Sequence, residues 1–220
     1  MDLSLYYHPL SSYCHKALIA LYEHGVAFEK RLIDLSSEAE RAELQALWPL
    51  VKFPVLRDQA RQRTVPESSV IIEYLDHQPG QSQRLVPEDW EIALEVRLWD
   101  RFFDHYVMTP MQQIVADRIQ SANGDLSSQR ALLATAYGML EQQLADREWI
   151  ASAEFSLADC SAAPALFYAS TLVPFAAEQP RLSAYFERLV QRPSFSRVIE
   201  EAKPWFDFYP FAEALPQRFR

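Results

Sequence analysis

The sequence of 220 residues is poor in glycine, cysteine and positive charge. Its four glycines are too far apart to form a glycine-rich phosphate loop, which excludes a P-loop and a dinucleotide-binding fingerprint. The two cysteines are too few for a disulfide framework and favour a reducing cytoplasm. The 21 basic and 30 acidic residues give a net charge of −9 without a basic cluster, so neither nucleic acid nor an anionic membrane is expected as a partner.

Several chemical motifs are also missing. The histidines and cysteines lack the spacing of a metal site, and there is no GxSxG motif of a serine hydrolase. No stretch approaches the roughly 18 uninterrupted apolar residues of a membrane helix. The first residues lack the basic start and apolar run of a secretory signal, so none is expected. With 49% hydrophobic and 23% charged residues, the composition is that of a folded globular chain.

Short strand-like and helix-like segments alternate through the first 78 residues. The patterns predict strands at 3–7, 26–33, 54–57 and 62–65, and helices at 13–24, 37–47 and 68–77. This β-α-β-α-β-β-α order predicts an α/β domain over residues 1–78, whose first two strands are parallel and joined by a right-handed crossover. The polar segment 79–87 is interpreted as a linker.

Residues 88–220 show helical patterns only and predict an all-α bundle. Helices are expected at 90–122, 126–145, 157–171, 181–191 and 194–202, and Pro110 should kink or break the first. That helix is apolar on more than one face, one of them formed by Leu94 and Leu98, which indicates enclosure by its own bundle and by a second subunit. Ser156 and Asp159 fit a capping box.

Three segments have the residue types needed to hold a small peptide. Serines at 11–12 join the first strand to the first helix, where hydroxyls and free backbone N–H groups favour an anion such as a thiolate. Phe53-Pro54 opens a strand and can leave backbone groups free to pair with an extended peptide. Glu67-Ser68 opens a helix and can hold an ammonium and a carboxylate. Each segment also has a purely structural explanation, as a helix cap or an edge-strand proline.

In this order, the phrases LYYHPLSSYCHKALIAL, LWPLVKFPVL, PESSVIIEYLD and FSLADCSAA resemble the cytosolic glutathione transferase family over essentially the whole chain. The resemblance implies a thioredoxin-like first domain that binds glutathione as co-substrate, a helical second domain with an electrophile pocket, and a homodimer, with no metal and no nucleotide. The serine loop is similar to that of zeta, theta and tau-like members. Trp48 and Val51 depart from the family phrase, which usually has Asn and Gly there.

By this resemblance, Ser11 donates a hydrogen bond to the glutathione sulfur, because it lies five positions before the basic residue Lys16. Two alternatives remain. Tyr6 or Tyr7 could take this role, as in tyrosine-type members. Cys14 occupies the second position of a CxxC-like stretch, where the helix N-terminus would lower its pKa and permit a mixed disulfide with glutathione.

The resemblance assigns glutathione binding to Lys52, Phe53, a cis Pro54, Glu67 and Ser68. It assigns the electrophile pocket to Leu10, Tyr106, Met108 and Met111. The aromatic run 204–211 either covers that pocket or packs on the surface. The sequence therefore predicts a glutathione S-transferase that activates the thiol for attack on small electrophiles. A glutathione-dependent isomerase or thiol reductase of the same fold, or a non-catalytic glutathione-binding protein, is the alternative.

Overall fold

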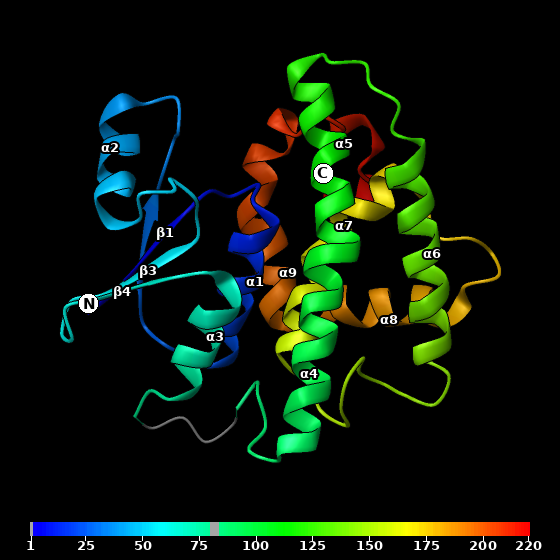
Figure 1. Ribbon diagram of the computed structural model, residues 1–220, viewed down its shortest axis with the longest axis horizontal. Helices are drawn as coiled ribbons and strands as arrows, with labels where there is room; N and C mark the ends of the chain where they lie inside the picture. The colour runs from blue at the N-terminus through cyan, green and yellow to red at the C-terminus, as the bar shows by residue number, and fades with distance from the viewer. Residues whose placement is uncertain (1, 80–83) are drawn as a thin grey trace.

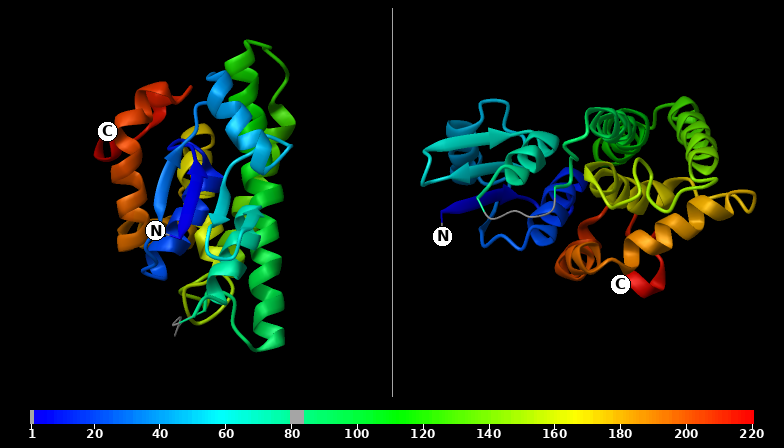
Figure 2. Two further views of the ribbon diagram at one scale, coloured as in Figure 1. Left: turned by 90° about the vertical axis from the view of Figure 1, so that its left-hand side faces the viewer. Right: turned by 90° about the horizontal axis from the view of Figure 1, so that it is seen from below.

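The computed structural model describes residues 2–79 and 84–220, with the sheet and its helices on one side and a helical bundle on the other (Figures 1 and 2). Residues 80–83 of the expected linker lie outside the described residues. The first half contains β1 (Leu3–Tyr7), α1 (Ser12–Glu23), β2 (Glu29–Leu32), α2 (Glu38–Leu47), β3 (Val55–Asp58), β4 (Arg63–Pro66) and α3 (Ser68–Asp76). The predicted β-α-β-α-β-β-α order is confirmed, although β2 is shorter than expected.

The four strands form one mixed sheet in the order β2-β1-β3-β4. β1 pairs with β2 in parallel, as expected, and with β3 antiparallel, while β3 and β4 form an antiparallel hairpin. Side chains alternate between the two faces of a strand. Leu5 and Leu56 therefore contribute to the main core with α1 and α3, whereas Val55 contributes to a smaller cluster with Ile33 and Leu44 under α2.

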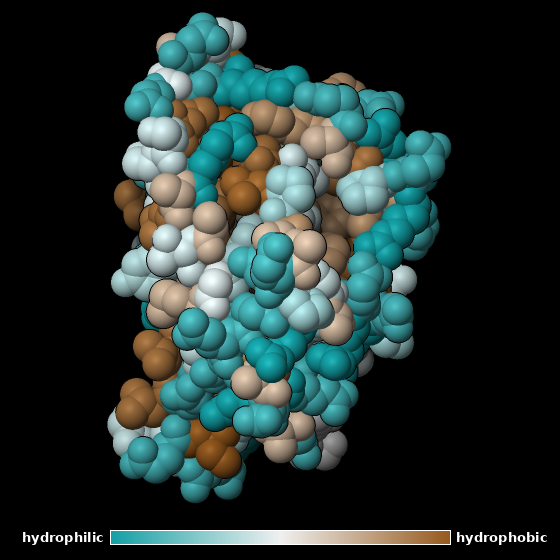
Figure 3. All heavy atoms as spheres, turned by 90° about the vertical axis from the view of Figure 1, so that its right-hand side faces the viewer, coloured by the Kyte–Doolittle hydropathy of each residue, from teal (hydrophilic) through white to brown (hydrophobic). Residues whose placement is uncertain are grey.

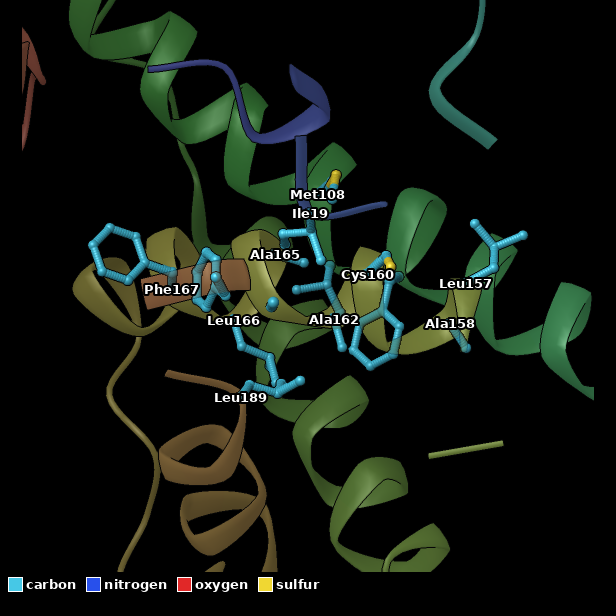
Figure 4. Packing of buried hydrophobic residues seen from close by; sticks show 14 of the residues in the cluster. Ile19, Met108, Leu157, Ala158, Cys160, Ala162, Ala165, Leu166, Phe167 and Leu189 are labelled. Atoms are coloured by element: carbon cyan, nitrogen blue, oxygen red, sulfur yellow. The ribbon is translucent and has the colours of Figure 1, made fainter. Parts of the chain in front are cut away.

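The second half is helical. Its elements are α4 (Trp90–Phe102), the π-helix η1 (Phe103–Met108), α5 (Thr109–Gln120), α6 (Ser127–Gln143), α7 (Leu157–Leu172), α8 (Pro180–Gln191) and α9 (Pro193–Ala202). α7 is the centre of the bundle: Ile19 of α1, Met108 of η1 and Leu189 of α8 lie around its buried side chains (Figure 4). The capping box of Ser156 and Asp159 at its start is confirmed.

The helical tract over 90–120, which was expected to kink or break at Pro110, continues past this residue, but its α-helical pattern is interrupted just before it. The wider π-helical turn precedes Pro110, which then occupies the first turn of α5. A proline is tolerated in the first turn of an α-helix, and its fixed φ suits the helix. Thr109 Oγ1 donates to the carbonyl of Asp104 at 2.9 Å within the π turn. Single π turns of this kind often occur at functional sites.

The C-terminal segment folds back over the bundle as the 3-10 turns η2 (Lys203–Phe208), η3 (Ala212–Ala214) and η4 (Gln217–Phe219). Phe206 stacks on Phe167 of α7 at 5.8 Å, and Phe219 packs against the same ring at 5.1 Å. The aromatic run is therefore anchored in the main core. Among the helices in residues 2–79 and 84–220, none is long and apolar enough to cross a membrane.

Candidate functional site

A cleft of about 320 Å³ lies where the first half meets the rod formed by α4, η1 and α5. The first half contributes the loop before β3, the start of α3 and one residue of α1. The rod contributes further polar side chains. The lining residues are Tyr13, Trp48, Lys52, Phe53, Pro54, Glu67, Ser68, Arg101, Asp104, His105, Thr109 and Gln112. The structure thus brings together all five residues that the sequence assigned to glutathione binding.

The loop before β3 presents free backbone groups to this cleft. The Phe53–Pro54 bond is cis, as expected. Neither the backbone N–H nor the C=O of Phe53 is engaged by any described residue. Val51 adopts a φ of 52°, and its N–H donates to the carbonyl of Trp48 at 2.9 Å. A β-branched residue thus adopts the left-handed conformation at the position where the family phrase usually has glycine.

The start of α3 has the features of a binding site for an amino-acid end. Glu67 caps the helix with a φ of 69° and makes no capping hydrogen bond through its side chain. Its carboxylate is exposed, while Ser68 is buried beside it. The first N–H groups of a helix lack intrahelical acceptors and attract anions. An ammonium at Glu67 and a carboxylate at the helix terminus can thus be held side by side.

Ser11 is the N-cap of α1. Its Oγ accepts a hydrogen bond from the Cys14 N–H at 3.3 Å. A hydroxyl that accepts a bond still has its own O–H to donate. Ser11 is half-buried and does not itself line the cleft, whereas Tyr13, two residues later, does. Ser12 is buried, and its Oγ has no partner among the described residues.

The alternatives for the thiol partner all have raised pKa values. Cys14 is fully buried, and burial raises the pKa of its thiol to about 12, so the expected lowering of this pKa is wrong. Desolvation of the thiolate outweighs the helix N-terminus. Burial also raises the pKa of Tyr6, whose hydroxyl is turned toward Glu43 of α2, and the pKa of Tyr7. Neither tyrosine lines the cleft.

The expected electrophile pocket is wrong in two residues. Met108 and Met111 are buried in the main core and are not available to a ligand. Tyr106 is half-exposed but does not line the cleft, and Leu10 packs against the core. The rod instead presents polar side chains, which the sequence analysis missed although their spacing puts them on one helix face: Arg101, His105, Thr109 and Gln112.

Tyr13 is a further lining residue that the sequence analysis missed. Burial raises the pKa of its hydroxyl to about 12, with the carboxylate of Asp104 adding to this. The hydroxyl therefore stays protonated at neutral pH and is able to donate.

A buried charge cluster lies directly behind the cleft. The Lys16 ammonium is fully buried and lies 2.5 Å from Asp100 Oδ1 and 3.1 Å from Asp104 Oδ2. Ser69 accepts from Lys16 at 2.8 Å and donates to Asp100 at 2.9 Å. Arg101 contacts both carboxylates and Ser69 from the solvent side. The cluster joins α1 and α3 to α4 and η1, and so fixes the two walls of the cleft relative to each other.

The C-terminal segment reaches the loop after β1. Trp205 packs edge-on against the His8 ring at 5.8 Å, and His8 stacks on Phe53 at 5.8 Å. Phe208 lies 6.2 Å from Trp205 and is largely exposed. The aromatic run therefore borders the site at Trp205 while Phe206 anchors it. In the described part of the chain, no group of three or more His, Cys, Asp or Glu side chains could hold a metal ion.

Comparison with known proteins agrees with this architecture. The model of the glutathione S-transferase N-terminal domain matches residues 5–83, and that of the C-terminal domain matches residues 104–193. The chain therefore belongs to the cytosolic glutathione S-transferase family.

Individual relatives and solved structures are distant. A glutathione S-transferase-like protein, LUC7, of Fusarium is 28% identical over 83% of this chain and 86% of that protein. A stringent starvation protein A homolog of Histophilus somni is 28% identical over 92% of each chain. A glutathione S-transferase structure from Methylobacterium radiotolerans, in complex with glutathione sulfonate, is 26% identical with a TM-score of 0.78, covering 90% of this chain and 94% of that one.

Proposed function

We propose that this protein is a glutathione transferase that binds glutathione in the cleft and activates its thiol with Ser11. The observation that carries the proposal is the convergence of the free Phe53 backbone, Glu67 and Ser68 on one cleft beside the start of α1. These groups match a γ-linked tripeptide: a strand-like backbone partner in the middle and an amino-acid clamp at one end.

Each group of the cleft has a separate role in holding the tripeptide. Glu67 binds the α-ammonium, and Ser68 with the first N–H groups of α3 binds the adjacent carboxylate. The N–H and C=O of Phe53 pair with the backbone of the cysteine. Lys52, which is exposed at the edge of the cleft, binds the glycine carboxylate. The sulfur is then placed near Ser11.

Activation of the thiol is an electrostatic task. A free thiol has a pKa of about 8.5 and is mostly protonated at neutral pH. Lowering this pKa by about two units requires about 2.7 kcal/mol of differential stabilisation of the thiolate. A hydrogen bond from the Ser11 O–H and the N-terminus of α1 are suited to supply it. The thiolate then forms a carbon–sulfur bond with an electrophile held beside it.

The test compares two neighbouring serines. Ser11→Ala should raise the pKa of bound glutathione toward that of the free thiol and remove most turnover, while calorimetric affinity for glutathione changes little. Ser12→Ala is the matched control, because Ser12 is buried, has no partner for its Oγ among the described residues and has no assigned role. Ser11→Asp keeps a capping acceptor but cannot donate, and separates cap loss from donor loss. Unchanged thiol pKa and turnover in Ser11→Ala would refute the role.

Conjugation is not the only chemistry this family membership permits. Relatives that are named stringent starvation protein A homologs, and not transferases, also match the chain. A non-catalytic glutathione-binding protein is the second candidate. A glutathione-dependent isomerase or reductase would use the same clamp. Retention on immobilised glutathione, followed by turnover assays with an aromatic chloride and a peroxide, discriminates these cases. Retention without any turnover or thiol ionisation would favour the binding protein.

We also propose a homodimer that covers the exposed stripe on α4. Leu94 and Leu98 are 49% and 57% exposed, one turn apart. Apolar side chains gather along this side of the molecule, seen at the lower left edge of Figure 3. The stripe lies on one of the two apolar faces for which the sequence predicts enclosure by the bundle and by a second subunit. Leu98→Arg should yield monomers in sedimentation, whereas Met139→Arg, an exposed position on α6, should not.

A further inference from the structure

His8 lies at the border of the candidate site and is held there from several sides. One face of its ring stacks on Phe53, a lining residue of the cleft, with an interplanar angle of 17°. The edge of Trp205 closes another side. The His8 carbonyl accepts from the Ser11 N–H at 3.1 Å, and its N–H donates to Cys14 Sγ at 3.5 Å. The ring is therefore fixed three residues before the expected thiol partner.

The hydrogen bonds of the ring determine which nitrogen carries the proton. The Leu10 N–H donates to His8 Nδ1 at 3.2 Å, so Nδ1 is an acceptor. In a neutral imidazole the proton then resides on Nε2. Burial lowers the pKa of His8, although Asp34 opposes this, and the lowered pKa favours the neutral ring. Nε2–H has no partner among the described residues, and the side chain is partly exposed. It is a fixed and free donor.

We propose that His8 Nε2–H donates a hydrogen bond to an oxygen of the second substrate, which makes electrophiles that develop negative charge on oxygen, such as α,β-unsaturated carbonyl compounds, the preferred class. The inference rests on the proposed transferase function and extends it to the electrophile. A neutral imidazole is suited to this task, because a donor aimed at the developing charge stabilises the transition state more than the ground state.

The reaction balances without a further reagent. The thiolate sulfur forms a bond to the β-carbon, the carbon–carbon π pair moves toward the carbonyl carbon, and the carbonyl π pair moves onto oxygen. His8 Nε2–H stabilises this enolate oxygen without transferring its proton. The proton that left the thiol to solvent is replaced by one from solvent at the α-carbon. The product is the saturated carbonyl conjugate of glutathione.

The test uses three variants and two electrophiles of equal chain length. His8→Phe keeps the stacked ring without a donor, His8→Asn keeps an acceptor for the Leu10 N–H, and His8→Gln keeps a distal N–H. Hexenal develops charge on oxygen, whereas iodohexane releases iodide. With hexenal, we expect kcat to fall about a hundredfold in His8→Phe and His8→Asn, as for removal of an oxyanion donor, and to recover largely in His8→Gln. With iodohexane, the losses should be much smaller.

Conjugate binding gives a second measurement that does not depend on turnover. In calorimetry, His8→Phe should bind the hexenal conjugate more weakly than wild type, with S-hexylglutathione bound equally by both. Equal losses on both electrophiles, or on both conjugates, would show that His8 only positions the loop and would overturn the inference. Unchanged kinetics would overturn it too. Failure of the wild type to bind S-hexylglutathione or to ionise the thiol would instead refute the proposed function itself.

Discussion

Lys16→Met tests the buried charge cluster behind the cleft. The substitution keeps an unbranched side chain but removes the ammonium, and leaves Asp100 and Asp104 without their buried counter-charge. The side chains of Lys16, Asp100 and Asp104 are 0%, 2% and 7% exposed, so water does not replace the lost partner. Removing one partner of a buried ion pair costs about 3–5 kcal/mol. Arg101 still contacts both carboxylates, so we expect about 3 kcal/mol.

The pH dependence of this loss has a defined sign. Burial raises the pKa of Asp100, but the charge of Lys16 and the hydrogen bonds to Asp100 outweigh burial, so this pKa lies below its ordinary value. For Asp104, burial outweighs Lys16, and its pKa lies above its ordinary value. Without Lys16, both values rise. A carboxyl whose folded pKa exceeds its unfolded pKa of about 3.9 binds protons more tightly in the native state, so stability falls as pH rises through that window. The deficit of Lys16→Met should therefore be largest at pH 7 and smaller near pH 5.

Urea denaturation followed by the fluorescence of the five tryptophans measures this deficit at both pH values, with all proteins at equal concentration. The double variant Lys16→Met/Asp104→Asn is the control. It retains Asp100 with Arg101 and should recover part of the loss. A deficit below about 1 kcal/mol at pH 7, the range of exposed ion pairs, would refute the argument from desolvation. A deficit that is equal at pH 7 and pH 5 would refute the pKa argument.

Three further predictions concern the loops of the site. Glu67→Gln should weaken glutathione binding about tenfold or more, because a charged hydrogen bond contributes about 1.5–3 kcal/mol. The control Glu73→Gln, on the same helix but paired with Arg97, should leave the calorimetric affinity for glutathione unchanged. Similar losses in both variants would contradict binding of the ammonium by Glu67. Cys14 should resist iodoacetamide in the native protein at neutral pH and react only after denaturation, as mass spectrometry would show, since burial raises its pKa to about 12; native alkylation would argue against this. Val51→Gly should change the melting temperature little, because relief of the left-handed backbone, about 1–2 kcal/mol, offsets the lost packing and the added entropy of the unfolded chain. Val65→Gly, at a buried strand position, should lower the melting temperature strongly. Equal losses in the two variants would exclude backbone strain at Val51.

The periodicity of the sequence was sufficient for most elements and for the order of the first half. Periodicity was insufficient to decide which residues of a helix line the cleft when the helix is apolar on two faces. Met108 and Met111 have the residue type of an apolar pocket, but the π turn and α5 direct them into the core. Arg101 and His105 of the same rod face the cleft. Sequence spacing groups the residues of one face but does not decide which face meets a neighbouring domain.

The pKa of Cys14 shows the same limit. Its position near the N-terminus of a helix is visible in the sequence, and this position alone favours the thiolate. The opposing desolvation depends on how completely α7 and the loop after β1 cover the side chain, which is fully buried. Because burial arises from segments distant in sequence, a local motif gave the wrong direction.

The three segments that the sequence predicts to bind glutathione converge because of the register of the sheet. Tyr6 is paired with Val55 across β1 and β3, and Val55 is paired with Pro66 across β3 and β4. The chain leaves the sheet beyond Tyr6 and beyond Pro66, and it enters the sheet just before Val55. All three connections therefore emerge at the same end of the strands. Residues 8–11, 53–54 and 67–68 must therefore lie together. The hairpin of β3 and β4 could be expected from sequence, but the pairing of β1 with β3 could not, and it is this pairing that brings the loop with Ser11 to the same end of the sheet as residues 53–54 and 67–68.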